Sequence, residues 1–324
     1  MPYRIVLGRP LHPAGAAVLA GRRDLEVTEM FDPPADRLRA ALAEADGLIA
    51  WLERVDEATL AAAPRLKVVS RVGVGFDTID IPACSARGIP VMVVNGTNDL
   101  SVAEHAMMLM LAVARRAVDA DAHVKAGGWW PAEGPRMVDL AGRTVLVVGY
   151  GRIGTRVAAY CRAFHMRVLV HDPFFHPARI AADGHEAARD LRAALAQSDV
   201  VTLHCPLTSA TRHLLDEAAF EALKPGAIVV NTARGPVVKQ AAVVEALRRG
   251  RIMGFGTDVL ETEPAEPGNP LLRLPNVIVS PHSAASTEEG LARMAVQAAR
   301  NLLDALDGRP DPAMMVNPDI LQRG

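Results

Sequence analysis

The chain has 324 residues, of which 50% are hydrophobic and 22% are charged, so it is long enough for two globular domains. Its formal net charge of −2 argues against a nucleic acid or a membrane surface as the main partner. The three cysteines (Cys84, Cys161 and Cys205) form no C-x-x-C pair, which argues against a disulfide framework or a zinc ribbon and favours a reducing cytoplasm.

The first third of the chain alternates short apolar strands with helices of about ten residues, which is typical of βαβ units and predicts a parallel sheet. The amino terminus reads as a first strand and not as a signal peptide. The expected strands are 3–8, 25–30, 47–51, 66–70 and 89–94, and the expected helices are 13–23, 35–45, 56–62 and 81–87.

Two glycines follow the strand that ends at Ser70, in the order Arg71-Val-Gly73-Val74-Gly75. Consecutive backbone N–H groups of such a turn can point into a crevice and bind a carboxylate. The alternative is a simple strand-to-helix turn, and the segment alone does not decide between them. Arg71 either adds a charge for an anionic substrate or is an ordinary surface arginine.

A dense cluster of turn residues at 95–99 is expected to connect two domains. After it, Ser101 and Glu104 have the spacing of a capping box and predict a long helix that runs to about Lys125. Apolar residues occupy most faces of this helix, so we expect it to be buried. Its apolar part ends at an Arg-Arg pair, far short of the ~20 residues that a membrane span needs.

The segment 127–142 contains Trp129 and Trp130 and lacks periodicity. It predicts a loop or a short arm. Exposed tryptophans there would suit a dimer contact, although such side chains more often fold back onto their own domain.

The order G-x-G-x-x-G, formed by Gly149, Gly151 and Gly154, follows an apolar strand and precedes a helical segment. The first glycine permits a tight turn, the second lets the backbone approach a pyrophosphate, and the third lets the helix pack on the strand. Asp172 ends the next strand and can accept hydrogen bonds from a ribose 2′-hydroxyl. The pattern therefore predicts a dinucleotide site; the alternative is a strand–turn–helix that binds nothing.

The acid at position 172 favours NAD over NADP, because a carboxylate would repel a 2′-phosphate. The basic side chains nearest in sequence that would favour NADP, His176 and Arg179, lie a few residues further on. A second series of βαβ units fills the rest of the chain, with strands at 200–203, 227–231, 253–257 and 277–280, helices at 186–197, 216–223, 237–249 and 287–306, and an irregular tail at 307–324.

Three unusual segments follow apolar strands in this second series. They carry Arg234, Glu263 and His282, and the carboxyl ends of parallel strands are where ligands bind. An arginine can hold a carboxylate with two hydrogen bonds, a histidine can transfer a proton near neutral pH, and a carboxylate can orient that histidine. Each residue taken singly could be structural, but together they predict an active site.

These motifs give the chain a clear resemblance to the D-2-hydroxyacid dehydrogenases, the family of the phosphoglycerate dehydrogenases and the hydroxypyruvate and glyoxylate reductases. Val-Gly-Tyr-Gly-Arg-Ile-Gly, Leu-His-Cys-Pro-Leu-Thr, Asn-Thr-Ala-Arg-Gly and Ser-Pro-His carry it over nearly the whole length. The resemblance implies two doubly wound parallel-sheet domains of α/β class. A flavodoxin-like substrate domain would comprise 1–98 plus 287–324, and a Rossmann NAD-binding domain would comprise 99–286. Homodimers are common in the family.

The resemblance also assigns roles. Arg234 would bind the substrate, His282 would be the acid/base and Glu263 its partner, with no metal. Val74 and Gly75 match the family's carboxylate-binding turn, next to which Arg71 would bind substrate. The residues expected to bind NAD are Val74, Val102, Gly149, Gly151, Arg152, Ile153, Gly154, Asp172, Pro173, His204, Cys205, Pro206, Thr211, Thr232, Ala233, Arg234, Asp258, His282 and Ala284.

The sequence departs from the family pattern after Gly235, where Pro236 and then Lys239-Gln240 replace a second glycine and an acidic pair. We expect this to alter the start of the following helix only. The chain also ends without the regulatory domain of many biosynthetic phosphoglycerate dehydrogenases, so we do not expect serine feedback through such a domain, and the substrate stays open.

The first hypothesis is therefore an enzyme that interconverts a small 2-keto acid and a D-2-hydroxy acid with NAD(H). The second is a nucleotide-sensing binding protein similar to the family's corepressor branch, which carries the same three residues; NADH oxidation with keto acids would distinguish them. A metal enzyme that uses His204, Cys205 and His282 is a distant third, because adjacent residues at one strand end point apart.

Overall fold

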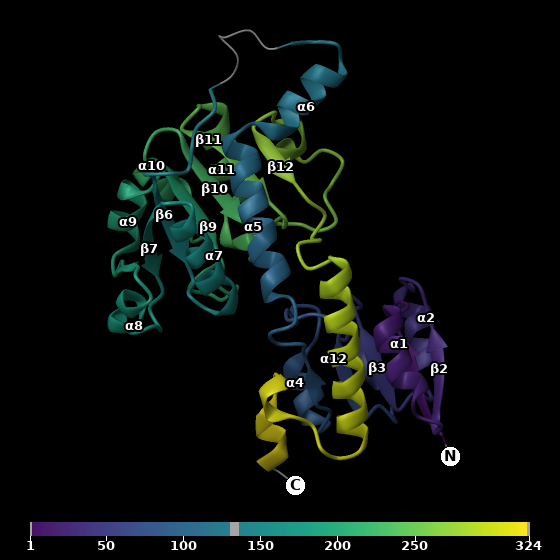
Figure 1. The fold of residues 1–324 in the computed structure, drawn as a ribbon. Helices are drawn as coiled ribbons and strands as arrows, with labels where there is room; N and C mark the ends of the chain where they lie inside the picture. Colours follow the sequence, from purple (N-terminus) through teal and green to yellow (C-terminus); the bar gives the residue numbers. More distant parts are fainter. Residues whose placement is uncertain (1, 130–135, 323–324) are drawn as a thin grey trace. The chain divides into compact units, whose positions relative to one another are not determined.

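The computed structural model describes residues 2–129 and 136–322, and these form two compact units (Figure 1). Unit 1 comprises Met1–Asn98 and Ser286–Gly324, and unit 2 comprises Asp99–Ala285. Unit 1 is therefore built from both ends of the chain, with unit 2 as an uninterrupted stretch between them. Trp130 lies outside the described residues.

Unit 1 contains a five-stranded parallel sheet of order β2-β1-β3-β4-β5, the flavodoxin-like doubly wound order. Apolar residues form the inner strands β3 and β4, which are buried, whereas the edge strand β2 is largely exposed. Its elements are β1 (Tyr3–Leu7), α1 (Pro13–Ala20), β2 (Leu25–Glu29), α2 (Ala35–Leu42), β3 (Gly47–Ala50), α3 (Glu57–Ala61), β4 (Val68–Arg71), α4 (Ile81–Ala86), β5 (Val91–Met92), α12 (Glu288–Leu306) and the 3₁₀ turns η3 (Pro312–Met314) and η4 (Pro318–Gln322).

The long helix α12 joins unit 1 from the far end of the chain and contacts α1, β3, β4 and β5. Gly15 makes the close contact with α1 possible, because a Cβ on it would lie only 2.6 Å from the Cβ of Ala295. Ser70 in β4 donates its hydroxyl hydrogen to the carbonyl of Ala298 at 2.8 Å. The apolar residues of α2, α3 and α4 pack together with Val6, Leu48, Ala50 and Val69.

Unit 2 contains a seven-stranded parallel sheet of order β12-β11-β10-β9-β6-β7-β8. The first strand of the unit, β6, lies between β7 and β9, which is the Rossmann order with its topological switch between β6 and β9. Its elements are α5 (Asp99–Ala114), α6 (Ala117–Lys125), β6 (Thr144–Val148), α7 (Arg152–Ala163), β7 (Arg167–His171), α8 (Pro177–Ala182), β8 (Glu186–Ala187), α9 (Leu191–Gln197), β9 (Val200–Leu203), α10 (Glu217–Ala222), β10 (Ala227–Asn231), η1 (Gly235–Val237), α11 (Gln240–Arg248), β11 (Ile252–Thr257), η2 (Pro270–Arg273) and β12 (Val277–Val279).

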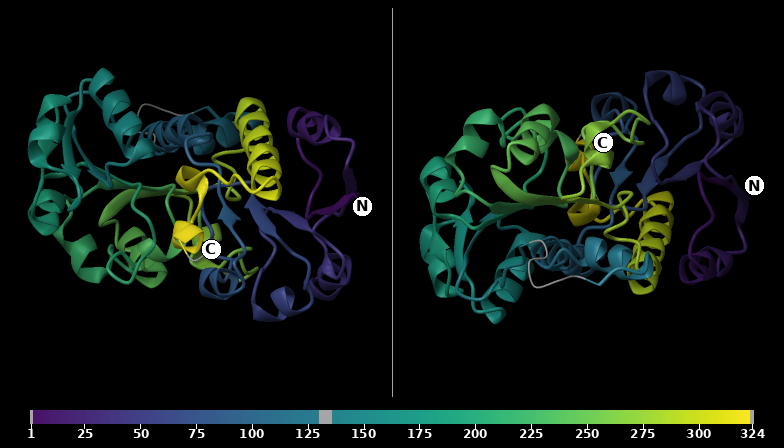
Figure 2. Two further views of the ribbon diagram at one scale, coloured as in Figure 1. Left: turned by 90° about the horizontal axis from the view of Figure 1, so that it is seen from below. Right: turned by 90° about the horizontal axis from the view of Figure 1, so that it is seen from above.

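Helices cover both faces of this second sheet, as the two views in Figure 2 show. Val145 and Val147 of β6 pack with α5 and α7, whereas Leu146 and Val148 pack with α9, α10 and α11. Successive side chains of β6 point to opposite faces of the sheet, so one unbroken apolar strand contributes to two separate cores. The two sheets confirm the predicted fold class of two doubly wound parallel-sheet domains.

The expected single helix from Ser101 to Lys125 is wrong. The helix α5 already begins at Asp99, so Ser101 lies inside it and is not the N-cap. The helix ends at Ala114, and α6 begins after Arg116, whose φ of 48° breaks the helical path. The expectation of burial holds for α5 but fails for α6, which has no buried residue. Within the described residues, no helix has both the length and the apolar character needed to cross a membrane.

Three other boundaries differ from expectation. The segment 186–197 is a short edge strand, β8, followed by α9, because the side chain of Asp190 caps the helix by accepting from the N–H of Ala193. The expected strand 89–94 pairs in the sheet only at Val91–Met92. A 3₁₀ turn precedes α11, which begins at Gln240 rather than at Val237.

Candidate active site

The glycine turn after β6 has the geometry that its sequence predicts. Gly149 has a φ of 92°, and a Cβ on it would lie 2.7 Å from the backbone nitrogen of Cys205 in the turn after β9. A Cβ on Gly154 would lie 2.0 Å from the carbonyl oxygen of Gly149. A Cβ on Gly151, in contrast, would meet nothing within 4 Å. The turn is therefore closed on the protein side and open at its second glycine, as a pyrophosphate needs.

We expect different results from adding a methyl group at each of these glycines. Gly154→Ala should lower the free energy of unfolding by about 1–3 kcal/mol, because the methyl overlaps backbone. Gly151→Ala should leave stability unchanged but weaken NADH binding about tenfold or more, because its methyl occupies the space of the phosphates. Urea unfolding and NADH fluorescence titration measure these effects. Gly268→Ala, in open space with an ordinary φ, is the control; unchanged NADH affinity in Gly151→Ala would contradict the assignment.

Asp172 follows the last residue of β7 and is fixed by two backbone hydrogen bonds. Its Oδ2 accepts from the N–H of Tyr150 at 2.7 Å, and its Oδ1 accepts from the N–H of Phe174 at 2.9 Å. A carboxylate offers about four acceptor positions, so two bonds leave capacity for a ribose hydroxyl. Pro173 lies between these contacts and helps to shape the turn. His176, one of the two residues considered for NADP, caps α8 instead by accepting from the N–H of Ala178.

Tyr150 is a residue of the glycine turn that sequence reasoning missed. Its side chain is fully buried, and its hydroxyl donates to Oδ2 of Asp183 at 2.8 Å. The ring packs edge-on against Phe175 with centroids 5.5 Å apart. Burial and the bond to Asp183 raise the pKa of Tyr150. The tyrosine therefore ties the glycine turn to the segment after β7; a large aromatic between two glycines was the signal for this.

The turn after β9 presents His204, Cys205 and Pro206 at the switch point. The ring of His204 lies with Nε2 2.9 Å from Oγ1 of Thr202 and Nδ1 3.4 Å from Oγ1 of Thr232. Burial lowers the pKa of His204 to about 3, so the ring is neutral. Burial likewise raises the pKa of Cys205 to about 11, so Cys205 is a thiol and not a nucleophile at neutral pH.

This neutral histidine makes a testable contribution to acid stability. Since the pKa of His204 in the folded protein lies below its ordinary value near 6.5, the unfolded chain binds a proton first as the pH falls. Stability is then lost below about pH 6.5. His204 is half-buried as a whole residue, so we expect a loss of about 1–2 kcal/mol between pH 7.5 and pH 5.

Urea unfolding at the two pH values measures this loss. His185 also has a pKa lowered by burial and acts in the same direction, so the comparison is between the wild type and His204→Gln. The variant should lose less stability on acidification. An equal loss in both proteins would show that His204 does not contribute.

Arg234 follows β10 in a turn that is held by a buried side chain. Asn231 donates from Nδ2 to the carbonyl of Arg234 at 3.0 Å, and its Oδ1 accepts from the N–H of Ala233 at 3.0 Å. The guanidinium donates from Nη1 to the carbonyl of Ala233 at 2.7 Å. Gly235 then allows a close approach to the next turn, because a Cβ on it would lie 1.8 Å from the carbonyl oxygen of Leu260.

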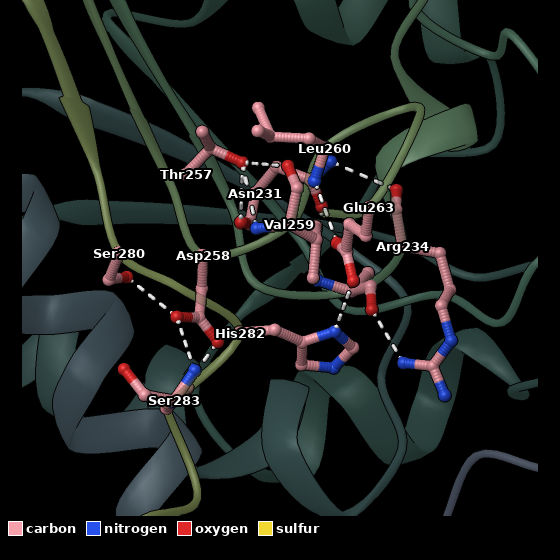
Figure 3. A network of polar contacts seen from close by, with 12 residues as sticks. Asn231, Arg234, Thr257, Asp258, Val259, Leu260, Glu263, Ser280, His282 and Ser283 are labelled. Atoms are coloured by element: carbon pink, nitrogen blue, oxygen red, sulfur yellow. Dashed lines mark hydrogen bonds and ion pairs between the residues drawn. The ribbon is translucent and has the colours of Figure 1, made fainter. Parts of the chain in front are cut away.

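Glu263 and His282 form a short hydrogen-bonded pair (Figure 3). Nδ1 of His282 lies 2.7 Å from Oε2 of Glu263, whose Oε1 accepts from the N–H of Leu260 at 2.8 Å. Since an ionised carboxylate can only accept, the ring proton is on Nδ1, and Nε2 is the atom that faces outward for other partners. Burial opposes ionisation of Glu263, but the bond to His282, the backbone bond and the charge of Arg234 outweigh it and lower the pKa of Glu263.

The backbone at His282 is left-handed, with a φ of 52°. The N–H of His282 donates to the carbonyl of Asp258 at 2.9 Å, and the carboxylate of Asp258 accepts from the N–H groups of Ser283 and Ala284 at 2.9 Å each. Figure 3 shows the imidazole of His282 and the guanidinium of Arg234 on the same side of Glu263. The structure thus brings Arg234, Glu263 and His282 into one group.

The remaining predicted residues of unit 2 lie around the same strand ends. Arg152 and Ile153 begin α7, and Val102 lies buried in the first turns of α5. Thr211 supports the turn after β9 by donating its hydroxyl hydrogen to the carbonyl of Pro206 at 2.6 Å. Thr232, Ala233 and Ala284 are buried.

The predicted carboxylate turn belongs to unit 1 and follows β4. Arg71 folds back over it: Nη1 donates to the carbonyl of Val72 at 3.0 Å and lies 1.7 Å from where a Cβ on Gly73 would be. The φ of 157° at Gly73 is a backbone conformation that residues with a side chain rarely adopt, so position 73 favours glycine. Val74 is partly exposed at the tip of the turn, next to Gly75. The arginine stabilises the turn, a role that its sequence position alone does not indicate.

Sequence reasoning also missed His105 and its contact with Ser280: the two side chains meet beside Asp258, with Nε2 of His105 2.7 Å from Oγ of Ser280. Ser280 is the first residue of the Ser-Pro-His motif, but His105 lies far from it in sequence and belongs to no motif that the sequence analysis used. Within residues 2–129 and 136–322, no group of three or more His, Cys, Asp or Glu side chains is arranged to hold a metal ion.

Comparisons with known proteins show which sequences this chain resembles. A model of the NAD-binding domain of D-isomer-specific 2-hydroxyacid dehydrogenases matches residues 107–284. A glyoxylate reductase of Aeropyrum pernix is 38% identical over 98% of this chain and 97% of its own length. A D-3-phosphoglycerate dehydrogenase of Mycobacterium leprae is 41% identical over 91% of this chain, which covers 56% of that longer protein.

Solved structures resemble the whole chain as well. The TT0316 protein of Thermus thermophilus has a TM-score of 0.89 at 38% identity and covers 97% of this chain and 99% of its own. A D-lactate dehydrogenase of Aquifex aeolicus, in complex with NAD and lactic acid, has a TM-score of 0.84 at 28% identity over 97% of this chain and 98% of its own. The relatives that are named for an activity here are oxidoreductases, which disfavours the binding-only hypothesis.

Proposed function

Because the chain belongs to the D-isomer-specific 2-hydroxyacid dehydrogenase family and is thus an NAD-dependent enzyme, we propose that it interconverts a small 2-keto acid and a D-2-hydroxy acid with His282 as the acid/base. The observation that carries this proposal is the pair of Nδ1 of His282 and Oε2 of Glu263 at 2.7 Å. This pair leaves Nε2 to exchange a proton, and it favours the charged imidazolium that reduction requires.

The proposed reaction uses three side chains. NADH supplies the hydride that C2 of the keto acid receives. Arg234 binds the substrate carboxylate, for which its planar guanidinium offers two parallel hydrogen bonds. His282 donates the proton on Nε2 to the carbonyl oxygen as negative charge develops there. Glu263 keeps the imidazolium oriented and compensates its charge; in the reverse direction the neutral ring accepts the proton.

The residues around the β6–β9 switch point fit NAD. The open face at Gly151 and the first N–H groups of α7 would receive the diphosphate, and Asp172 would accept from the ribose. The turn of residues 204–206 would cover the adenine side. Thr232, Ala233 and Asp258 would line the nicotinamide side.

Unit 1 would act as the substrate domain. In this proposal the backbone N–H groups of Val74 and Gly75 bind a carboxylate, while Arg71 supports the turn. The glyoxylate reductase match over nearly the whole chain supports a small keto acid as substrate.

A steady-state screen tests the proposed function. Purified protein is mixed with NADH and glyoxylate, hydroxypyruvate, pyruvate, bulkier keto acids or phosphohydroxypyruvate, and NADH oxidation is followed. We expect turnover with at least one small keto acid, with a D-configured product wherever C2 becomes chiral. Tight NADH binding without turnover on any of these acids would contradict the proposal and favour a binding protein.

We also propose a homodimer in the cytoplasm. No residue of α6 is buried, and Val118, Val124 and Trp129 expose 56%, 50% and 84% of their surface. Such apolar side chains in one segment suit a contact with a second copy. The three cysteines are buried free thiols, which suits a reducing compartment. Light scattering should give twice the mass of the chain, and a monomer at micromolar concentration would contradict the dimer.

A further inference from the structure

The turn that carries His282 has a backbone that is costly for a residue with a side chain. Its φ of 52° lies in the left-handed region, which residues other than glycine adopt mainly where the surroundings hold them. The position of the imidazole depends on this backbone. Whatever holds the turn therefore also sets the direction of Nε2.

A single buried carboxylate holds the turn on both sides of His282. Asp258, which is 2% exposed, accepts from the N–H groups of Ser283 and Ala284 after the histidine. It also accepts from the hydroxyl of Ser280 before the histidine, at 2.6 Å. Two of these three donors are fixed backbone N–H groups, but the third is a hydroxyl that can rotate. The orientation of Asp258 therefore depends on the direction in which the Ser280 hydroxyl points.

The hydroxyl of Ser280 is directed by a histidine from another element. A serine hydroxyl has one hydrogen, and Ser280 gives it to Oδ1 of Asp258, since a carboxylate only accepts. Nε2 of His105 lies 2.7 Å from Oγ of Ser280, whose only hydrogen is already given to Asp258, so Nε2 must carry a hydrogen and donate it. The ring is mostly buried, with 17% of its side chain exposed, and Nε2 is also 3.7 Å from Oδ1 of Asp258.

We propose that His105 is a positioning residue that holds the His282 turn through Ser280 and Asp258. It lies in α5, which packs against β10, β11 and β12, so the chain of bonds anchors the turn to a rigid element. His105 itself has no contact with the reacting atoms in this assignment. The inference rests on the proposed function, because holding this turn matters for catalysis only if His282 transfers the proton.

His105→Leu removes the donor and fills the space. We expect kcat for keto-acid reduction to fall about tenfold or more, because a small displacement of a catalytic group is enough for such a loss. NADH binding should be unchanged. The solvent deuterium isotope effect on kcat should rise as proton transfer becomes slower, which a general loss of stability would not produce. His105→Gln, whose amide N–H can replace Nε2–H, should recover most of the rate.

Ser280→Ala breaks the same chain with a smaller change and should give the same rate and isotope effects, which keeps the test available if His105→Leu folds poorly. Glu104→Gln is the matched control, since Glu104 is the exposed neighbour of His105 on α5. Histidine-ring NMR of the protein without cofactor provides a readout besides activity. It should find a proton on Nε2 of His105 in the wild type and in Glu104→Gln.

An unprotonated Nε2 at neutral pH would overturn the proposal, and so would wild-type kcat and isotope effect in folded His105→Leu and Ser280→Ala. If only the role of His105 is wrong, His282→Gln is still inactive. If the proposed function itself is wrong, His282→Gln turns over as fast as the wild type, so the two failures are distinguishable.

Discussion

Replacing His282 by glutamine is expected to lower kcat for keto-acid reduction by about 10²–10⁴-fold, the usual contribution of a positioned general acid. Glutamine can still donate a hydrogen bond to Glu263 and fill the site, but it has no proton to give to the developing alkoxide. NADH affinity should stay close to that of the wild type. Steady-state kinetics at saturating NADH and a fluorescence titration measure the two quantities.

His165→Gln is a matched control for this variant. His165 has the same left-handed backbone, with a φ of 59°, but it is exposed and lies before the amino end of β7, whereas His282 follows the carboxyl end of its strand. It should show wild-type kinetics. A fully active His282→Gln would remove the proposed acid, whereas equal losses in the two variants would point to a general effect on folding.

Glu263→Gln probes the same pair from its other side. The pKa of Glu263 is lowered in the folded protein, so the carboxylate is ionised throughout the neutral range, and the charge that favours the imidazolium is lost only as the pH falls below about 4.5. Glutamine can still accept the hydrogen bond from Nδ1 of His282, but it cannot compensate a positive charge on the ring during proton transfer. Steady-state kinetics should therefore show a lower kcat/KM for reduction in Glu263→Gln, and an unchanged kcat/KM would contradict the role of the pair.

The inner strands of both sheets could be predicted because they are short apolar runs that are buried on both faces, for example residues 145–148. The Arg, Glu and His positions could be predicted because each follows such a strand, and parallel strands end at a common edge. The structure brings these three side chains together, while their roles stay predictions until the variants are measured.

Other features depend on contacts that the local sequence does not contain. The left-handed Arg116 divides the expected long helix, although both halves have helical composition. The strand β8 forms because Glu186–Ala187 pairs with β7, an interaction set by the sheet and not by strand propensity. The bond between His105 and Ser280 joins residues 175 positions apart. Periodicity cannot show such a bond, since it describes only one element at a time.

Arg234→Ala is expected to lower kcat/KM for the keto acid by about 10²–10⁴-fold, with most of the loss in KM. Two hydrogen bonds between charged groups contribute about 1.5–3 kcal/mol each, and the truncated side chain makes neither. The turn itself should survive, because Asn231 holds it through the backbone carbonyl of residue 234. NADH affinity should change much less, since the glycine turn and Asp172 are untouched.

Arg234→Lys distinguishes charge from geometry. Lysine keeps the positive charge but presents a single point donor in place of the planar fork. If bidentate binding of the carboxylate matters, this variant should recover only a small part of the lost kcat/KM. Full recovery would mean that charge alone suffices. Arg248→Ala, an exposed arginine in the last turn of α11, is the control for a change in net charge. Wild-type kcat/KM in Arg234→Ala would remove Arg234 from the site.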